Sequence, residues 1–167
     1  MTIRAPERAL AERRELCGAH HEIEPILTRI DALAEMAGNL ASPDLDEALR
    51  VLLDSMAVSL LPHFDWEDAT LIPALDPSAG PSSGGHLLRQ QHAQIRQGIE
   101  RLTVSRMALG HEPTHRQLGD LRARLYGLHA LLCAHLEQEE DALLPALGEA
   151  ILAETQAGSP DRTAPGP

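Results

Sequence analysis

Two stretches of the sequence each place a histidine four residues before a glutamate within an otherwise apolar segment. They read PHFDWEDATLIPAL, with His63 and Glu67, and AHLEQEEDALLPAL, with His135 and Glu139. Residues four apart lie on one face of a helix, about 6 Å from each other, so each pair could bind one ion together. Imidazole and carboxylate groups are common ligands of transition-metal ions. The spacing therefore favours metal ligation at both places.

The two stretches belong to a longer internal repeat. A shift of 72 residues superimposes them and also places His20 on His92. The chain thus reads as two helical hairpins, each with a histidine on its first helix and a His-x-x-x-Glu on its second. If the hairpins pack face to face, six side chains reach one level of the core: His20, His63, Glu67, His92, His135 and Glu139.

Core packing alone does not explain such a cluster. A single histidine on an apolar stripe is most often a hydrogen-bonded core residue. Two buried carboxylates, however, repel each other, and burial of each charge costs several kcal/mol. Cations between them would remove both penalties. Imidazole and carboxylate ligands without thiolate suit iron or manganese and tolerate zinc, and two glutamates near the axis could each bridge two ions.

Four amphipathic helices are the elements that would position these side chains. Apolar residues recur at alternating three- and four-residue spacing in four segments. We expect breaks at Ser42, an N-cap candidate, at the stretch DPSAGPSSGG from Asp76, and near Thr114. We therefore predict an all-α, up-down-up-down four-helix bundle over residues 1–154 and a disordered tail over residues 155–167.

Two prolines fall inside the predicted helices, close to the candidate ligands. Pro25 follows His20, and Pro62 directly precedes His63. Because proline lacks a backbone N–H, we expect each to kink its helix.

Composition and charge limit the class of protein. The 167 residues suit one compact domain, and 43% hydrophobic residues with only 2% aromatics favour helices. A net charge of −11 argues against nucleic acid and acidic membrane surfaces as partners. Because the sequence shows neither a secretory signal nor an apolar run of bilayer length, we expect a cytoplasmic protein. Cys17 and Cys133 are expected to be two small buried thiols that form no disulfide.

The stretches AHHEI, PHFDWEDATLIPAL, QQHAQI and AHLEQEEDALLPAL resemble the hemerythrin-like, or HHE cation-binding, proteins. The resemblance covers the chain from about Arg8 to Leu147. It implies a four-helix bundle that holds a non-haem di-iron centre with oxo and carboxylate bridges. By this similarity Glu67 and Glu139 would be the bridging residues. The terminal ligands would be His20, His63, His92 and His135.

One departure from the oxygen-carrying members of that family bears on function. Those proteins use a fifth histidine, four residues from another on the third helix, but the positions four before and four after His92 are Leu88 and Arg96. The sequence resembles instead the branch with four histidines and two glutamates, which includes iron-centre repair proteins and iron-sensing relatives. Fewer protein ligands leave exchangeable positions on the irons. Such positions fit reaction with dioxygen, peroxide or nitric oxide better than reversible oxygen carriage.

Two functions follow from this resemblance. The first is a di-iron protein that binds or reacts with O2, NO or H2O2 in oxidative or nitrosative stress or in iron handling. The second is a non-enzymatic iron or oxygen sensor, or an iron-delivery module, that acts through a partner protein. A structural bundle with a zinc clip is a weaker third interpretation. Enzymatic activity and oligomeric state are left open.

The assignment of the two glutamates has one alternative. Glu140 could replace Glu139, but Glu139 lies on the apolar stripe and matches Glu67 across the repeat. With Glu139 as the ligand, we expect Asp68 and Glu140 to be solvated residues at the flank.

Three further histidines lie near the predicted ligands. His86 and His129 each sit six residues before one of them and could line an access channel or supply a fifth histidine. His21 is a weaker candidate, because the shift maps it onto Ala93.

Overall fold

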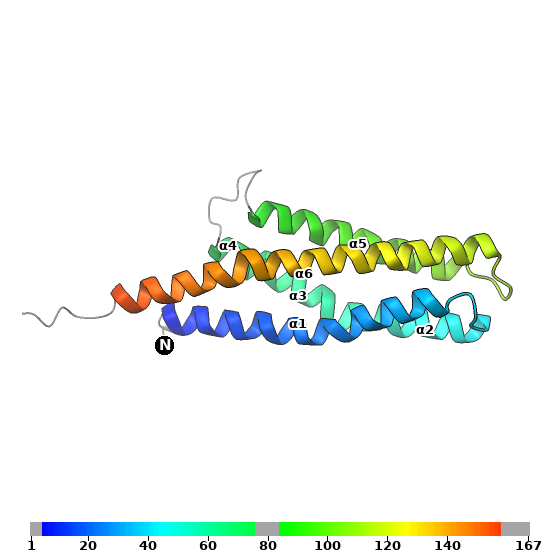
Figure 1. The fold of residues 1–167 in the computed structure, drawn as a ribbon, viewed down its shortest axis with the longest axis horizontal. Helices are drawn as coiled ribbons and strands as arrows, with labels where there is room; N and C mark the ends of the chain where they lie inside the picture. The colour runs from blue at the N-terminus through cyan, green and yellow to red at the C-terminus, as the bar shows by residue number, and fades with distance from the viewer. Residues whose placement is uncertain (1–4, 76–83, 158–167) are drawn as a thin grey trace, which may run out of the picture.

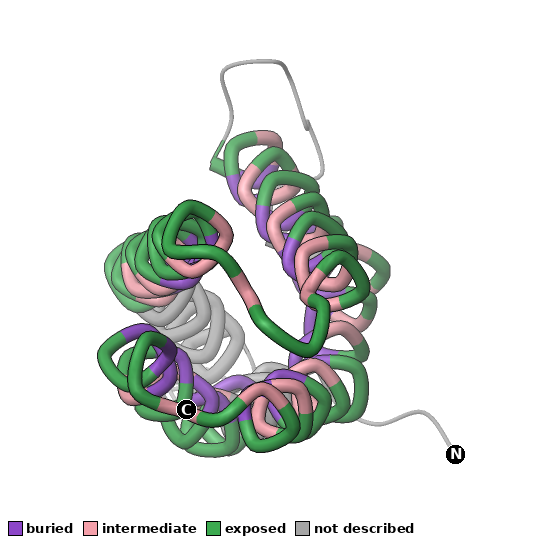
Figure 2. The backbone as a smooth tube through the Cα atoms, turned by 90° about the vertical axis from the view of Figure 1, so that its right-hand side faces the viewer, coloured by how far each residue is buried: buried purple, intermediate pink, exposed green. Residues whose placement is uncertain are grey.

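Four helical runs, each antiparallel to the next, make up the parts of the chain that the computed structural model describes, residues 5–75 and 84–157 (Figure 1). The up-down-up-down order predicted from the sequence is confirmed. Viewed from the end, buried residues follow the sides of the helices that face one another (Figure 2). The runs are α1 (Ala5–Met36), a composite second run, α5 (Gly84–Ala108) and α6 (His115–Ala157).

The second run is not a regular α-helix. Two π-helical turns interrupt it, so that it reads α2 (Ser42–Ser55), η1 (Met56–Leu60), α3 (Leu61–Trp66), η2 (Glu67–Leu71) and α4 (Ile72–Leu75). At the end of each π turn a backbone N–H donates to the carbonyl five residues back. These bonds run from Leu61 to Met56 and from Ile72 to Glu67.

A proline follows each π turn after one residue. Pro62 and Pro73 have no N–H to donate, and in a regular α-helix their rings would clash with the carbonyl four residues earlier. The wider π turn moves that carbonyl aside, so the run continues in the same direction. The interruption predicted at Pro62 therefore takes the form of a π turn, whereas α1 continues through Pro25.

The start of the second run differs by one residue from the prediction. Ala41 occupies the N-cap position without a side-chain hydrogen bond, and Ser42 is already the first residue of α2. The Ser42 hydroxyl instead donates to the His111 carbonyl at 2.5 Å. It thereby ties the α1–α2 turn to the α5–α6 turn at the same end of the bundle.

The start of α6 is confirmed by its cap. The Thr114 hydroxyl accepts the Gln117 N–H at 3.2 Å, and the Gln117 side-chain oxygen accepts the Thr114 N–H at 2.9 Å. This reciprocal pair is a capping box, which satisfies backbone donors at a helix start.

The apolar core has two parts. The larger part fills the bundle from the two short turns as far as Phe64, Ile95 and Leu132. The smaller part lies toward the other end and contains Leu16, Leu71, Ile72 and Leu88, with Trp66 packed against it. Along the chain, His20 and His92 each fall between residues of the two parts, and Glu67 falls between Phe64 and Leu71. These side chains therefore lie in apolar surroundings, where unpaired charges are costly.

The helix α6 extends to Ala157, past the expected end of the bundle domain at residue 154. Residues 158–167, most of the predicted tail, lie outside the described residues. Within the described ranges, no helix combines the length and the apolar character needed to cross a bilayer.

Candidate metal centre

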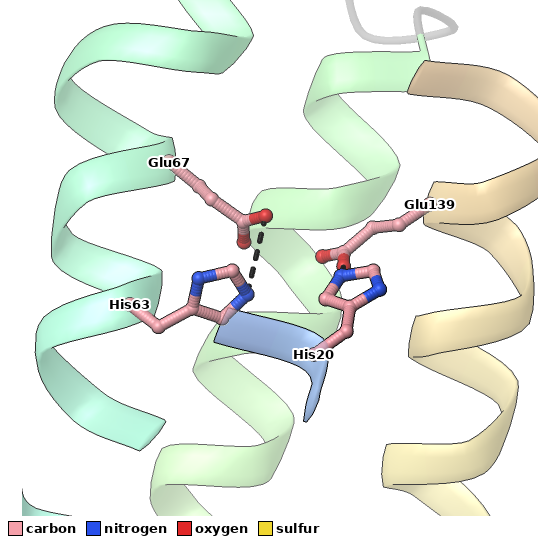
Figure 3. Close-up of side chains that lie close together, drawn as sticks. All are labelled: His20, His63, Glu67 and Glu139. Atoms are coloured by element: carbon pink, nitrogen blue, oxygen red, sulfur yellow. Dashed lines mark hydrogen bonds and ion pairs between the residues drawn. The ribbon is translucent and has the colours of Figure 1, made fainter. Parts of the chain in front are cut away.

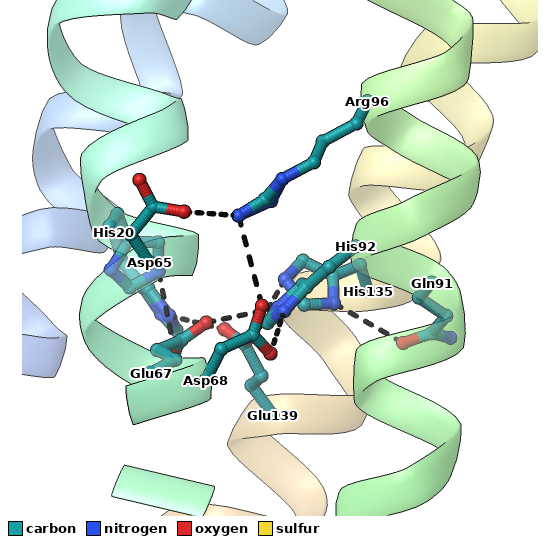
Figure 4. Close-up of polar contacts among 10 residues, drawn as sticks. His20, Asp65, Glu67, Asp68, Gln91, His92, Arg96, His135 and Glu139 are labelled. Carbon is teal, nitrogen blue, oxygen red and sulfur yellow. Dashed lines mark hydrogen bonds and ion pairs between the residues drawn. The ribbon is translucent and has the colours of Figure 1, made fainter. Parts of the chain in front are cut away.

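The six predicted side chains meet at one level of the bundle, and all four helical runs contribute (Figures 3 and 4). Five of the six are buried, and the sixth, His20, has a side chain that is 13% exposed. Their sources are α1 for His20, α3 for His63, η2 for Glu67, α5 for His92, and α6 for His135 and Glu139.

Glu139 contacts histidines from three helices. Its Oε2 accepts a hydrogen bond from His20 Nε2 at 2.8 Å (Figure 3). Its Oε1 lies 2.6 Å from His135 Nε2 and 3.9 Å from His92 Nε2. This carboxylate therefore joins the two hairpins.

Glu67 repeats this arrangement from the other side. Its Oε1 lies 3.3 Å from His63 Nε2, within its own helical run, and its Oε2 lies 3.2 Å from His92 Nε2. Under the shift of 72 residues these two contacts correspond to those that Glu139 makes with His135 and His20. The sequence repeat is thus present as a repeat of contacts.

Most of these short distances are not hydrogen bonds. The Nε2 atoms of His63, His92 and His135, both oxygens of Glu67 and Oε1 of Glu139 are buried without a partner in hydrogen-bonding geometry. A buried polar atom without a partner costs about 1–3 kcal/mol, and here six of them converge. Cations among these atoms would offset that cost. The donor atoms present therefore fit a metal site.

The cluster contains two overlapping sets of ligand atoms, and within each set all atoms lie within 4.8 Å of one another. Glu67 and Glu139 belong to both sets. The first set is completed by His20 and His63, and the second by His92 and His135.

Comparison with models of known families matched residues 13–147 to the hemerythrin HHE cation-binding domain. The chain belongs to the hemerythrin HHE family. No curated protein and no solved structure gave a significant match. The family assignment and the buried His/Glu cluster agree on cation binding, as predicted from the four sequence stretches.

The electrostatics of this HHE domain differ sharply between its two buried glutamates. Burial raises the pKa of Glu67 to about 8, although the contact with His92 opposes the shift. Burial also acts on Glu139, but the contacts with His135, His20 and His92 outweigh it and hold the pKa well below its usual range. At neutral pH, Glu67 therefore carries a proton and Glu139 a negative charge.

The pKa values of two of the histidines shift in opposite directions. Burial lowers the pKa of His63 to about 4. Burial acts in the same sense on His92, yet the nearby carboxyl groups of Glu139 and Glu67 and the hydrogen bond to Asp68 outweigh it and raise the pKa of His92 to about 9. Because metal ligands must be deprotonated, an ion that binds here would displace protons from Glu67 and His92.

Asp68, which the sequence analysis expected to be a solvated residue, holds a histidine of the HHE cluster. Its side chain is only 32% exposed, and its Oδ1 accepts the Nδ1–H of His92 at 2.8 Å (Figure 4). The expectation was wrong because the residue after Glu67 is turned about 100° around the helix axis, toward α5. Once the second proton of His92 is displaced, the proton that stays on Nδ1 leaves the Nε2 lone pair facing the cluster.

Gln91 is a second outer residue that sequence reasoning missed. Its side-chain oxygen accepts the Nδ1–H of His135 at 3.2 Å, and its amide nitrogen donates to Gln138 at 2.7 Å. The second bond orients the amide so that its oxygen faces His135. Adjacency to His92 was the only sequence signal, and it does not reveal which neighbouring helix Gln91 contacts.

The alternatives weighed from the sequence fall outside the two ligand sets. Glu140 is 61% exposed and lies 3.8 Å from His20 Nδ1, and His21 is 87% exposed. Among the described residues, neither set includes His86 or His129. His129 instead lies 3.8 Å from the sulfur of Cys133. Both cysteines are unpaired thiols, as predicted, but Cys17 is exposed and Cys133 is half-buried, so the expectation that both are buried was wrong.

Proposed function

We propose that this HHE domain holds a dinuclear non-haem iron centre and uses it to bind or react with O2, NO or H2O2. One observation carries the proposal: Glu67 and Glu139 belong to both overlapping ligand sets. Two carboxylates shared in this way suit bridges between two ions. In the described part of the chain neither set contains a cysteine, and mixed imidazole and carboxylate ligation suits iron.

The six side chains would divide into equal halves. His20 and His63 would hold one ion, His92 and His135 the other, and the two glutamates would join them. With four protein groups near each position, six-coordinate ions would keep positions for an exogenous small molecule. The bound irons would supply the redox and ligand-binding chemistry, while the surrounding apolar side chains limit the entry of bulk water.

Access for a small molecule is available between α1 and α6. A groove of about 420 Å³ there is lined by Cys17, His20, Cys133, Leu136 and Glu140, among others. It reaches His20, whose side chain is partly exposed. We place this chemistry in the cytoplasm, in oxidative or nitrosative stress or in iron handling.

The test is anaerobic loading of untagged protein with ferrous iron, followed by metal analysis and separate exposure to O2, H2O2 and NO. We expect two irons per chain and a change in the absorption spectrum with at least one of the three molecules. Glu139→Gln should lose iron, whereas the matched variant Glu140→Gln should keep it. Less than one iron per chain, with zinc in its place, would contradict the proposal.

A further inference from the structure

The repeat allows the surroundings of the two halves of the cluster to be compared residue by residue. The shift of 72 residues relates Asp68 to Glu140, a pair of like charge on matching histidines. It also relates Arg96 to Glu24, where the charge is reversed, and Gln91 to Ala19, where the amide is lost. The inner ligands are therefore repeated, but the residues behind them are not.

The outer residues behind His92 form a continuous network. Arg96 Nη2 donates to Asp65 at 2.5 Å and lies 3.7 Å from Asp68, whose other oxygen accepts from His92 (Figure 4). Arg96 thus neutralises the charge of both aspartates and keeps Asp68 against the imidazole.

The aromatic ring of Phe64 packs face to face against the imidazole of His92. The two rings are stacked, with centroids 4.3 Å apart and planes inclined by 17°. Arg96 lies over the ring of Phe64, 5.5 Å from its centroid. The same phenylalanine meets His135 edge to face at 5.1 Å. Together with Gln91, these contacts restrain both histidines of the second hairpin.

Among the described residues that line the groove at His20, none is a lysine or an arginine. Glu140 is 3.8 Å from His20 Nδ1 and largely exposed. The counterparts of Arg96 and Asp65 are Glu24 and Glu137, and all three glutamates line the groove that reaches His20. Three like charges around one groove repel one another, so nothing comparable to Arg96 draws Glu140 onto the imidazole.

In the described part of the first hairpin, the hydrogen bond between Gln91 and His135 has no counterpart. The position equivalent to Gln91 is Ala19, which has no side-chain amide to offer His63. An outer hydrogen bond fixes the tautomer and orientation of a ligating histidine, and its loss typically weakens metal binding by about 10- to 100-fold.

We propose that the two metal positions are unequal: the position formed with His92 and His135 binds its ion first and more tightly, and the position formed with His20 and His63 binds second and exchanges. The difference arises because, among the described residues, His92 and His135 are the two cluster histidines with a hydrogen bond to a residue outside the cluster. This inference rests on the proposed dinuclear centre, with the two glutamates shared. The first ion therefore enters a site whose imidazoles are already oriented, whereas the second must order His20 and His63 as it binds.

The test is an anaerobic titration of the metal-free full chain with ferrous iron against a competing chelator. We expect two steps whose dissociation constants differ by about 10-fold or more. Asp68→Asn and Gln91→Ala should each weaken the first step by about 10- to 100-fold, because each change weakens or removes an outer hydrogen bond to a ligating histidine. Gln91→Ala also reproduces the residue found at the equivalent position, Ala19. Glu140→Gln is the matched control and should leave the first step unchanged.

A gain-of-function variant tests the same idea from the first hairpin. Glu24→Arg supplies the cation that Arg96 provides in the other half, so it should tighten the second step alone. Glu24→Gln removes the negative charge without adding a cation and should have a smaller effect. Both changes are at an exposed residue, so circular dichroism should show an unchanged fold.

The outcomes separate this inference from the proposed centre. Binding of less than one ion per chain would contradict the dinuclear centre itself. Two ions bound with equal affinity would leave the centre intact and contradict the inequality. Equal weakening by Asp68→Asn and Glu140→Gln would also contradict it, because the outer contacts would then not distinguish the two positions.

Discussion

Glu67 and Glu139 occupy equivalent positions in the two hairpins, and both are fully buried, yet their pKa values shift in opposite directions. Glu139 faces three histidines, two of them at 2.6 and 2.8 Å, whereas Glu67 faces two, at 3.2 and 3.3 Å. Two residues of the same type in the same fold position can thus hold different charges. Burial favours the neutral carboxyl group and nearby donors favour the carboxylate, so the number and distance of the donors determine which form is present.

The largest difference between the two glutamates should appear in the stability of the metal-free protein. Glu139→Gln removes a buried charge and leaves its histidine partners unpaired, which should lower the free energy of unfolding by about 3–5 kcal/mol. Glu67→Gln replaces a side chain that is already neutral at pH 7 and should cost about 1 kcal/mol or less. Urea unfolding of both variants measures the difference. Similar losses would show that the two carboxyls carry the same charge.

The pH dependence of the metal-free protein should show the same asymmetry. The pKa of Glu67 is raised from 4.5 to about 8 and that of His92 from 6.5 to about 9, so both groups lose stabilising protonation as the pH rises. The lowered pKa values of His63 and Glu139 act only below about pH 6.5. The free energy of unfolding should therefore fall between pH 6.5 and 9, by on the order of 5 kcal/mol.

Chemical denaturation across that pH range tests this expectation. The metal-loaded protein serves as the comparison, because the ions would already have displaced the protons and should flatten the profile. A metal-free profile that rises with pH would contradict the assigned protonation of Glu67 and His92.

Phe64 offers a smaller test, since its counterpart in the other hairpin is Leu136. Phe64→Leu removes the ring stacked on His92 and leaves a cavity among fully buried side chains. We expect a loss of about 1–2 kcal/mol in thermal or urea unfolding. Leu136→Ala, at a half-buried position beside the groove, should lower the free energy of unfolding by less. A larger loss for Leu136→Ala than for Phe64→Leu would contradict the greater importance of the contact with His92.

The smallest expected effect concerns the carboxylates behind the histidines. Asp68→Asn weakens a charge-assisted hydrogen bond to His92 and should cost about 1 kcal/mol in the metal-free protein. Glu140→Gln, at a mostly exposed residue, should change stability by less than about 0.5 kcal/mol. Unfolding curves of the two variants, collected side by side, would resolve the difference. Equal effects would contradict a stabilising hydrogen bond between Asp68 and His92.

The bundle and the six clustered residues were predictable because they depend on periodicities along the chain. The apolar stripe places His63, Glu67, His135 and Glu139 inward, and the repeat adds His20 and His92. Asp68 and Gln91 were not predictable, because their roles depend on which helix lies beside them and at what height. No spacing within one segment contains that information.

The π turns left a signal that was not used. Buried residues in α6 alternate between four- and three-residue spacing, through Leu121, Leu125, Leu128 and Leu132. In the second run, Leu52, Met56, Leu60 and Phe64 follow one another at four-residue intervals. A repeated interval of four exceeds the α-helical period of 3.6 and indicates a wider turn.

The two π turns also mean that the hairpins differ in how they can tolerate changes in chain length. Because a π turn holds one residue more than an α turn, a single deletion within Met56–Leu60 would convert the turn to regular α-helix and keep His63 and Glu67 facing the core, although the clash at Pro62 would then return. The same deletion before His135 in the uninterrupted α6 would rotate that histidine and Glu139 by about 100° relative to the preceding core residues. The second run therefore keeps its ligands in register after a single deletion, whereas the last helix does not.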